Sequence, residues 1–357
     1  MELLSVTMND GVKPRSEIEG KDNSSEDKSN YKIVRKGDMV YNSMRMWQGA
    51  NGISPCDGIV SPAYTVLMPK QEINNGYFAA LFKSANLINE FRKNSQGMTS
   101  DTWNLKYPQI ETIKVQIPSV SEQDKVSEMF SVLDERIAAQ SQLVESLKKY
   151  KRGVVRTLLS PKHCKLKNVE WTTAKIGDIG TFIKGAPLSK ADISSDGTPF
   201  ILYGELYTTY NEVISKVVRK TQASVDKQYY SQIGDVIIPT SGETPEEIST
   251  ASCVMLPDII LAGDLNIYRC TQVDGRIMSY ILNHVVNDRI ARVAQGKSIV
   301  HVQATEISKI EITYPDLISQ KKLIETFDAI TARIDHSMRE LELLQVHRKA
   351  LLQQLFI

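Results

Sequence analysis

The strongest constraint on the fold of this chain is an internal repeat. When its 357 residues are shifted against themselves by 197 positions, residues 117–160 align without a gap with residues 314–357. Further upstream, Gly37-Asp38 falls on Gly234-Asp235 at the same shift. The matched pairs in the long segments include Pro118 and Pro315, Gln123 and Gln320, Phe130 and Phe327. A match over this length indicates a duplicated domain rather than a solenoid, whose repeats are roughly 20–45 residues long.

Both repeated tails predict long helices. Their apolar residues recur with alternating spacings of four and three, which is typical of a coiled-coil seam. The seam residues are Val126, Phe130, Leu133, Ile137, Val144, Leu147, Val154 and Leu158, and Leu323, Phe327, Ile330, Ile334, Leu341, Leu344, Leu351 and Leu355. Each helix has about 38 residues and is about 57 Å long at 1.5 Å per residue. We expect the two helices to pair antiparallel, with one globular domain at each end; alternatively, each helix packs on its own domain.

Both seams are polar at matching positions. Gln140 corresponds to Ser337, and Lys151 corresponds to Arg348. The favoured interpretation of the two basic residues is that they extend their charged groups out of the helix pair into water. The alternative is that they fix the helix register or contact a partner subunit.

The remaining segments predict mixed globular domains of the α+β class. Short strands are expected at 39–41, 64–68, 113–117, 200–203, 235–239, 259–261 and 310–313, and helices at 77–93 and 277–293. The expected boundaries are a first domain at 1–117, a first helix at 118–160, a second domain at 161–314 and a second helix at 315–357. The first domain lacks a segment that corresponds to residues 171–197, so it is expected to be shorter at its start.

Composition and motifs argue against an enzyme. The net charge is +1, from 43 basic and 42 acidic residues, which neither indicates nor excludes a polyanionic partner. The cysteines Cys56, Cys164, Cys253 and Cys270 have no CxxC spacing, so a zinc site is not expected and a reducing cytoplasm fits. The sequence contains no long apolar run or secretory signal, and no phosphate loop or nucleophile elbow. We therefore expect a binding or assembly component with no catalytic residues, metal or cofactor of its own.

Three motifs carry a resemblance to a known family. They are GDMVYNSMRMWQGANGISPCDGIVSPAYTVL at 37–67, IPSVSEQDKVSEMFSVLDERI at 117–137, and W-x-x-x-K-I-G-D-I-G at 171–180. With the alternation of variable domain and repeated helix, they make nearly the whole chain resemble the specificity subunit of type I restriction-modification enzymes. The resemblance implies a non-catalytic subunit whose two target-recognition domains each read half of a bipartite DNA target, with the helices holding them apart.

The same resemblance implies the partners. The helices would dock methyltransferase subunits, which bind S-adenosylmethionine, and an ATP-driven restriction subunit would join the assembly, so S-adenosylmethionine, ATP and magnesium are expected on the partners. It also implies that the end of the second helix comes close to the start of the first domain. Because the two domains differ in sequence, the two half-sites should differ and the target should be asymmetric.

Bases are read in the major groove by side chains with paired donors or acceptors, such as Arg or Lys on guanine and Asn or Gln on adenine. We expect such residues in the loops beside the repeated strands, although each could equally be a solvated loop side chain, and Trp47 could belong to the core. The candidates for DNA contact are Asn42, Arg45, Trp47, Gln48, Gln96, Lys184, Lys190, Ser241, Gln295 and Lys297.

An adaptor without DNA-binding activity is the alternative function. In that interpretation, the duplicated coiled coil is a scaffold that joins two protein partners. DNA binding with a steep dependence on salt would distinguish the first interpretation from the second.

Overall fold

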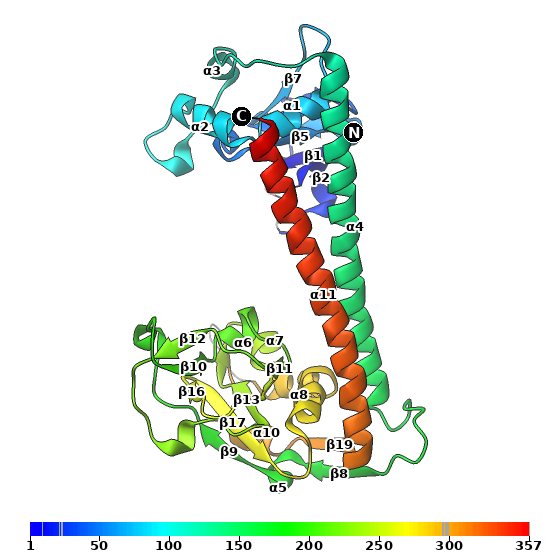
Figure 1. Cartoon of the computed structure of the whole chain (residues 1–357), viewed down its shortest axis with the longest axis vertical. Coiled ribbons are helices and arrows are strands. Elements are labelled where there is room, and N and C mark those ends of the chain that lie inside the picture. Colours follow the sequence, from blue (N-terminus) through cyan, green and yellow to red (C-terminus); the bar gives the residue numbers. More distant parts are fainter. Residues whose placement is uncertain (9, 21, 23, 295, 297–299, 357) are drawn as a thin grey trace. The chain divides into compact units, whose positions relative to one another are not determined.

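The computed structural model describes residues 1–8, 10–20, 22, 24–294, 296 and 300–356. The chain divides into two compact units, and each contains one α+β domain. Unit 1 comprises residues 1–144 and 337–357, and unit 2 comprises residues 145–336. The long helices α4 (Val120–Leu158) and α11 (Leu317–Leu355) each continue across a boundary between the units (Figure 1).

The first domain contains two sheets, with strand orders β2-β1-β6-β3 and β5-β4-β7. Its elements are β1 (Glu2–Thr7), β2 (Gly11–Pro14), η1 (Arg15–Glu17), β3 (Lys32–Val34), β4 (Met39–Asn42), η2 (Met46–Gln48), β5 (Asn51–Ile53), β6 (Gly58–Val60), β7 (Tyr64–Leu67), α1 (Asn75–Leu81), α2 (Ala85–Asn94), η3 (Ser100–Thr102) and α3 (Tyr107–Ile110).

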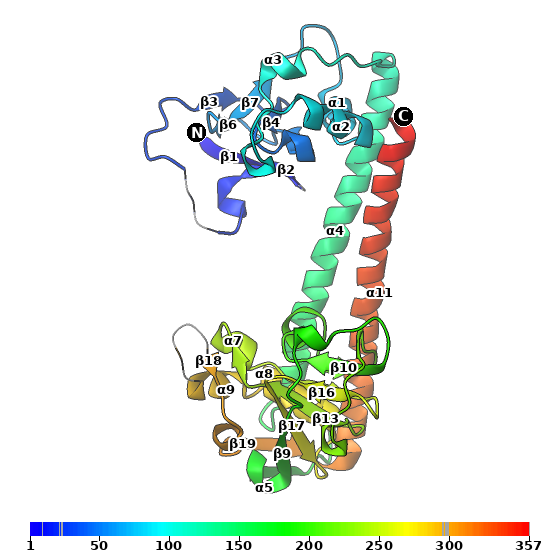
Figure 2. The same cartoon turned by 90° about the vertical axis from the view of Figure 1, so that its left-hand side faces the viewer.

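The second domain is organised around the sheet β11-β15-β13-β17-β9, which Figure 2 shows from a second side. Smaller sheets have the orders β12-β10-β16, β19-β8 and β14-β18. Its strands are β8 (Trp171–Lys175), β9 (Gly180–Lys184), β10 (Thr198–Leu202), β11 (Val213–Ile214), β12 (Arg219–Thr221), β13 (Asp235–Pro239), β14 (Ser241–Gly242), β15 (Ser252–Val254), β16 (Ile260–Ala262), β17 (Leu265–Cys270), β18 (Val300–His301) and β19 (Glu311–Pro315). Its helices are α5 (Ile176–Ile179), η4 (Lys190–Asp192), α6 (Glu205–Thr208), η5 (Lys227–Tyr229), α7 (Pro245–Ile248), α8 (Gly275–His284), α9 (Asn287–Val293) and α10 (Ala304–Ile307).

The strand registers repeat between the two domains. Met39 of β4 lies opposite Ile53 of β5 and Leu67 of β7. Val236 of β13, which is 197 positions later, lies opposite Cys253 and Tyr268 in the corresponding strands. The parallel pairs also correspond, because Leu4 lies opposite Val60 and Ile201 lies opposite Leu261. The sequence repeat is therefore a duplication of tertiary structure.

A buried glutamine links each long helix to its domain. The side-chain amide of Gln123 donates to the carbonyl of Pro118 (2.9 Å) and accepts from the N–H of Asn74 (3.0 Å). Gln320 makes the matching bonds to Pro315 (2.8 Å) and to the N–H of Asp274 (2.7 Å). Asn74 and Asp274 cap helices α1 and α8. Both glutamines are 1% exposed, so each repeated residue satisfies two backbone groups at the same buried junction.

Within each unit the long helices contact each other. In unit 1, Gln140 donates to the carbonyl of Ser337 (2.9 Å), and Arg348 forms an ion pair with Asp134. These contacts pair earlier residues of α4 with later residues of α11, so the two segments run antiparallel. In unit 2, residues near the end of α4 share the domain core with residues near the start of α11: Val155, Leu159, Leu323, Ile324 and Phe327.

The predicted seam shifts at the end of α11. Leu355 is 46% exposed, whereas Leu352 and Phe356 are buried, so the assignment of Leu355 to the seam is wrong. An α-helix has 3.6 residues per turn, and its apolar stripe drifts away from a strict seven-residue repeat. Phe356 lies edge-on to Tyr77 and stacked on Phe130. The end of the second helix thus packs against α1 of the first domain and against α4.

Three predicted elements are corrected. Residues 113–117 form no strand. The helix expected at 77–93 is divided into α1 and α2, because the hydroxyl of Ser84 accepts from the N–H of Leu87 and caps a new helix. The helix expected at 277–293 is likewise divided into α8 and α9, where Val286 leaves the helical conformation with φ −118°.

Candidate nucleic-acid interface

The first candidate loop follows β4. The side chain of Asn42 accepts from the N–H of Met44 (3.0 Å), which turns the chain directly after the strand. Arg45 is exposed and precedes η2, and Gly49 ends η2 with φ +85°, a conformation that glycine adopts without strain. Gln48 is half-buried in η2. The turn therefore presents Arg45 to solvent from a closely constrained backbone.

A second loop lies against the first. Its ends are joined by the bridge between Gln96 and Asn104, and the N–H of Leu105 donates to the carbonyl of Ser43 (2.8 Å). The structure thus brings Gln96, which is exposed, onto the same surface as residues 42–48.

Trp47 connects the two loops. Its ring meets Trp103 edge-on at 5.1 Å between centroids, and the Arg92 guanidinium lies 5.8 Å from the Trp47 ring. Its indole N–H donates to the carbonyl of Met44 (3.2 Å), and the side chain is half-buried. Sequence reasoning missed Arg92 and Trp103, although Trp103 stands just after the repeated Gln96-Gly97 segment and could have been found there.

The second domain joins the corresponding loops with the same hydrogen bond. The N–H of Val302 donates to the carbonyl of Thr240 (3.0 Å), and these residues lie 197 positions after Leu105 and Ser43. Lys184 ends β9 at the same end of the sheet, and Lys190 begins η4; both are exposed. The candidates Gln295 and Lys297 lie outside the described residues.

Ser241 is not available for base contact in this structure. It is 5% exposed, and its hydroxyl donates to the carboxylate of Asp264 (2.9 Å). Its carbonyl accepts from the hydroxyl of Tyr207 (2.7 Å). The hydroxyl of Ser241 is thus engaged inside the domain, which argues against a direct contact with bases. A two-residue strand at a loop position leaves no periodic pattern that could have revealed this in the sequence.

The loops have the same backbone connections but different chemistry. The first domain presents Arg45, whereas the corresponding loop of the second domain contains Glu243 and is followed by Glu247 in α7. The carboxylate of Glu247 accepts from the N–H of Glu243 (2.8 Å), so part of this negative charge is used to hold the loop. The two domains thus share this hydrogen bond, whereas the residues that follow β4 and β13 carry unlike side chains.

Comparison with known proteins agrees with this arrangement. The sequence model described as the type I restriction modification DNA specificity domain matches residues 5–149 and 168–345. The chain belongs to the type I restriction-modification DNA specificity family.

Individual members of the specificity family resemble the chain over most of its length. The type I restriction enzyme MjaVIII specificity subunit of Methanocaldococcus jannaschii is 21% identical over 350 residues, which cover 90% of this chain and 79% of that protein. The putative MjaX specificity subunit of the same organism is 22% identical over 297 residues, covering 78% and 66%.

Solved structures share the fold of this specificity-family chain. One comes from a structural study of complex assembly and conformational transition of the type I R-M system, with a TM-score of 0.61, 14% identity and coverage of 92% and 83%. Another is the type I restriction-modification S subunit from M. genitalium, with a TM-score of 0.56, 15% identity and coverage of 91% and 84%.

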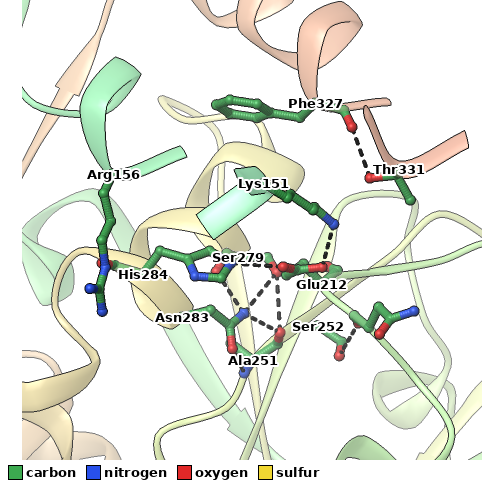
Figure 3. A network of polar contacts seen from close by, with 11 residues as sticks. Lys151, Arg156, Glu212, Ala251, Ser252, Ser279, Asn283, His284, Phe327 and Thr331 are labelled. Atoms are coloured by element: carbon green, nitrogen blue, oxygen red, sulfur yellow. Dashed lines mark hydrogen bonds and ion pairs between the residues drawn. The ribbon is translucent and has the colours of Figure 1, made fainter. Parts of the chain in front are cut away.

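A buried polar cluster attaches α4 to the second domain in this family member (Figure 3). The ammonium of Lys151 lies 2.8 Å from the carboxylate of Glu212 and 5.2 Å from the centre of the Tyr280 ring. Nε2 of His284 lies 2.7 Å from the other carboxylate oxygen. Burial raises the pKa of Glu212, but the hydrogen bond with His284 and the charge and hydrogen bond of Lys151 outweigh it and lower the pKa to about 2.

The favoured interpretation of the basic seam residues is therefore wrong for Lys151, which is only 7% exposed and points into the domain. Arg348 contacts the other helix, since its Nη2 lies 3.0 Å from the carboxylate of Asp134. Its guanidinium also lies 5.8 Å from the centre of the Phe130 ring. The two matched positions thus fix their helices by different contacts.

The cluster of Figure 3 does not form a nucleophile with a base. The Ser279 hydroxyl donates to the carbonyls of Glu212 (2.6 Å) and Ala251 (3.2 Å), and His284 is directed at Glu212 instead. Among the residues that the structure describes, three or more His, Cys, Asp or Glu side chains nowhere converge as metal ligands. No helix within the same described residues has the length and apolar character that crossing a membrane requires.

Proposed function

We propose that the chain is a non-catalytic specificity subunit that reads a bipartite, asymmetric DNA target, with one half-site for each domain. Recognition of DNA sequence follows from the family to which the chain belongs. The observation that carries the finer proposal is the repeated loop pair. In support, the bond from Leu105 to Ser43 and the bond from Val302 to Thr240 join a later segment to the residue after β4 and after β13 in the same way, while the side chains after these strands differ.

In this proposal the loops enter the major groove. Asn42, Arg45, Gln48 and Gln96 have the donors and acceptors to read base edges in the first half-site, and Lys184 and Lys190 contact phosphates or bases in the second. Trp47 supports the first loop pair through its ring contacts with Trp103 and Arg92. Gln295 and Lys297 remain candidates from their repeat position alone.

The two long helices are proposed to set the separation of the half-sites. Supporting this role, α4 and α11 are each continuous over 39 residues and contact each other within each unit. A helix of that length spans about 58 Å, which is enough to separate two groove contacts by a helical turn of about 34–36 Å.

The helices are also proposed to dock methyltransferase subunits, to which a restriction subunit is added. Exposed apolar side chains on their unit 1 segments support a protein-binding role: Val132 is 60% exposed, Leu343 is 68% exposed and Val346 is 59% exposed. S-adenosylmethionine, ATP and magnesium would be held by those partners. The assembly would act in the cytoplasm, where the DNA is.

The test uses the chain in complex with its methyltransferase subunits and a duplex that contains the methylated target. Arg45→Ala should weaken binding about 5- to 150-fold, because a bidentate contact to a base contributes about 1–3 kcal/mol. The matched control is Arg35→Ala, since Arg35 is exposed but precedes β4 at the opposite end of that strand. Equal effects of the two substitutions would contradict the assignment of the loop surface.

A salt series on the same complex tests the function itself. A DNA-reading subunit should lose affinity steeply as salt rises, because binding releases counterions from the phosphates. Binding of protein partners with no affinity for any duplex, at any salt concentration, would instead indicate the adaptor.

A further inference from the structure

The last turn of α2 brings a second arginine to the loops of the first domain. Arg92 is exposed there, and its guanidinium lies over the Trp47 ring, 5.8 Å from the ring centre. Trp47 is itself fixed, because its indole N–H donates to the carbonyl of Met44 (3.2 Å) and its ring meets Trp103 edge-on. An arginine contacts an aromatic face without using up its N–H groups. Trp47 therefore holds Arg92 beside the turn that presents Arg45.

The N–H groups of the Arg92 guanidinium are free to bind a ligand. Among the residues that the structure describes, the Arg92 side chain forms no hydrogen bond and no ion pair. The next residue differs, because the ammonium of Lys93 lies 2.7 Å from the carboxylate of Glu90. A guanidinium presents five donors in a planar fork that matches two oxygens of a phosphate. Arg92 thus combines a fixed position with a charge that no carboxylate neutralises.

The repeat shows how an arginine at this position acts when it has a structural partner. Arg289 of α9 stands 197 positions after Arg92, and its Nη1 donates to the carbonyl of Glu311 (2.9 Å). The residue that corresponds to Glu311 in the first domain is Lys114, but the Arg92 side chain contacts Trp47 instead. One matched arginine therefore ties two segments of its domain together, whereas the other lies at the loop surface.

We propose that Arg92 binds a phosphate of the DNA backbone beside the first half-site and thereby positions Arg45 for base reading. The inference rests on the function proposed above, because it concerns the same loop surface. Phosphate contacts fix the register and orientation of a protein on a duplex without reading its sequence. Arg92 suits that role because α2 packs against η2 and so flanks the turn after β4. The turn would enter the groove, and the end of α2 would meet the backbone at its edge.

The experiment measures the affinity of the chain, in complex with its methyltransferase subunits, for a duplex that contains the methylated target. Salt is varied from about 50 to about 200 mM, and each phosphate contact contributes about 0.9 to the slope of log affinity against log salt. Arg92→Ala should lower the slope by about 0.9, so its deficit in affinity should shrink about 3- to 4-fold over this range. The methylated sequence should not change.

Two further substitutions separate the charge of Arg92 from its contact with the ring. Arg92→Lys retains the charge and should restore the slope. Arg92→Gln keeps an extended polar side chain without the charge and should lose the same slope as Arg92→Ala, which it replaces if that variant does not fold. The melting temperature of each complex shows whether it is folded.

Two control substitutions remove a charge that is already engaged. Lys93→Ala removes a positive charge one residue later, from an ammonium paired with Glu90, and should leave the slope unchanged. Arg289→Ala removes the matched arginine of the second domain. It should lower the melting temperature, because the carbonyl of Glu311 loses a donor, and should also leave the slope unchanged.

The outcomes distinguish this proposal from the function on which it rests. If the unaltered complex binds with a steep dependence on salt but Arg92→Ala keeps the full slope, the phosphate contact is refuted and the function stands. A lower melting temperature with that full slope would show that Arg92 only supports the Trp47 ring. An equal loss of slope in Lys93→Ala would also refute the contact, since total charge would then explain both. A complex with no affinity for any duplex would refute the contact and the function together.

Discussion

At the scale of single residues, the matched glutamines explain why the repeat is strict at the start of each helix. Gln123 and Gln320 were visible in the sequence as a matched pair, but their role was not, because each accepts from a backbone N–H nearly 50 positions away. Polar residues on a helix usually face solvent, and only tertiary structure shows that these two are buried.

Gln123→Ala should lower the free energy of unfolding of unit 1 by about 1–3 kcal/mol, because it leaves the N–H of Asn74 and the carbonyl of Pro118 buried without partners. Thermal or denaturant unfolding measures the change. Gln142→Ala is the matched control, since Gln142 is exposed on the same helix, and a loss of the same size there would refute the role of the buried amide.

The pKa of Glu212 predicts how stability depends on pH. It is lowered to about 2 from an ordinary value of 4.5, so the unfolded chain binds more protons than the folded chain between these values. The contribution of Glu212 is complete above about pH 4.5 and is lost as the pH falls through 2. Unfolding of the unaltered chain and of Glu212→Gln, measured from pH 6 to pH 2, should show the stability difference shrinking as acid is added. A difference that stays constant across this range would contradict the assignment.

At the scale of elements, sequence reasoning located the elements that have a long periodic pattern. It failed where the structure of a segment depends on contacts with residues distant in sequence. The heptad stripes located both long helices within a few residues. Residues 113–117 have the alternation of a strand but form none, since no strand among the described residues of the first domain takes the place of β8, which pairs with β19 in the second. For the candidate site, the loops were located by the repeat, whereas the burial of Ser241 and the ring contacts of Trp47 depend on residues distant in sequence.

The pair of Arg348 and Asp134 tests the helix register in unit 1. Arg348→Ala should lower the melting temperature only slightly, because an exposed ion pair contributes about 0–1 kcal/mol. Arg348→Asp should cost more, since it places two carboxylates together, and the double variant Arg348→Asp with Asp134→Arg should recover most of that loss. A double variant that is less stable than both single variants would show that the two side chains do not meet.

At the scale of the whole molecule, α4 and α11 are proposed to set the distance between the two half-sites. Removing one heptad from both α4 and α11 shortens each by about 10 Å, or about three base pairs. The complex should then modify a target whose half-sites are unchanged but lie closer together. Mapping of methylated sites measures this, and altered half-site sequences would refute the spacer role.

Whether each domain reads its own half-site is decided by a map of methylated sites in cells that carry the chain and its methyltransferase subunits. The map should be made before and after residues 171–312 are replaced by the corresponding segment of another family member. One half of the target should change to a new sequence while the other half is retained. A target that changes in both halves, or in neither while methylation continues, would contradict the claim that each domain reads its own half-site.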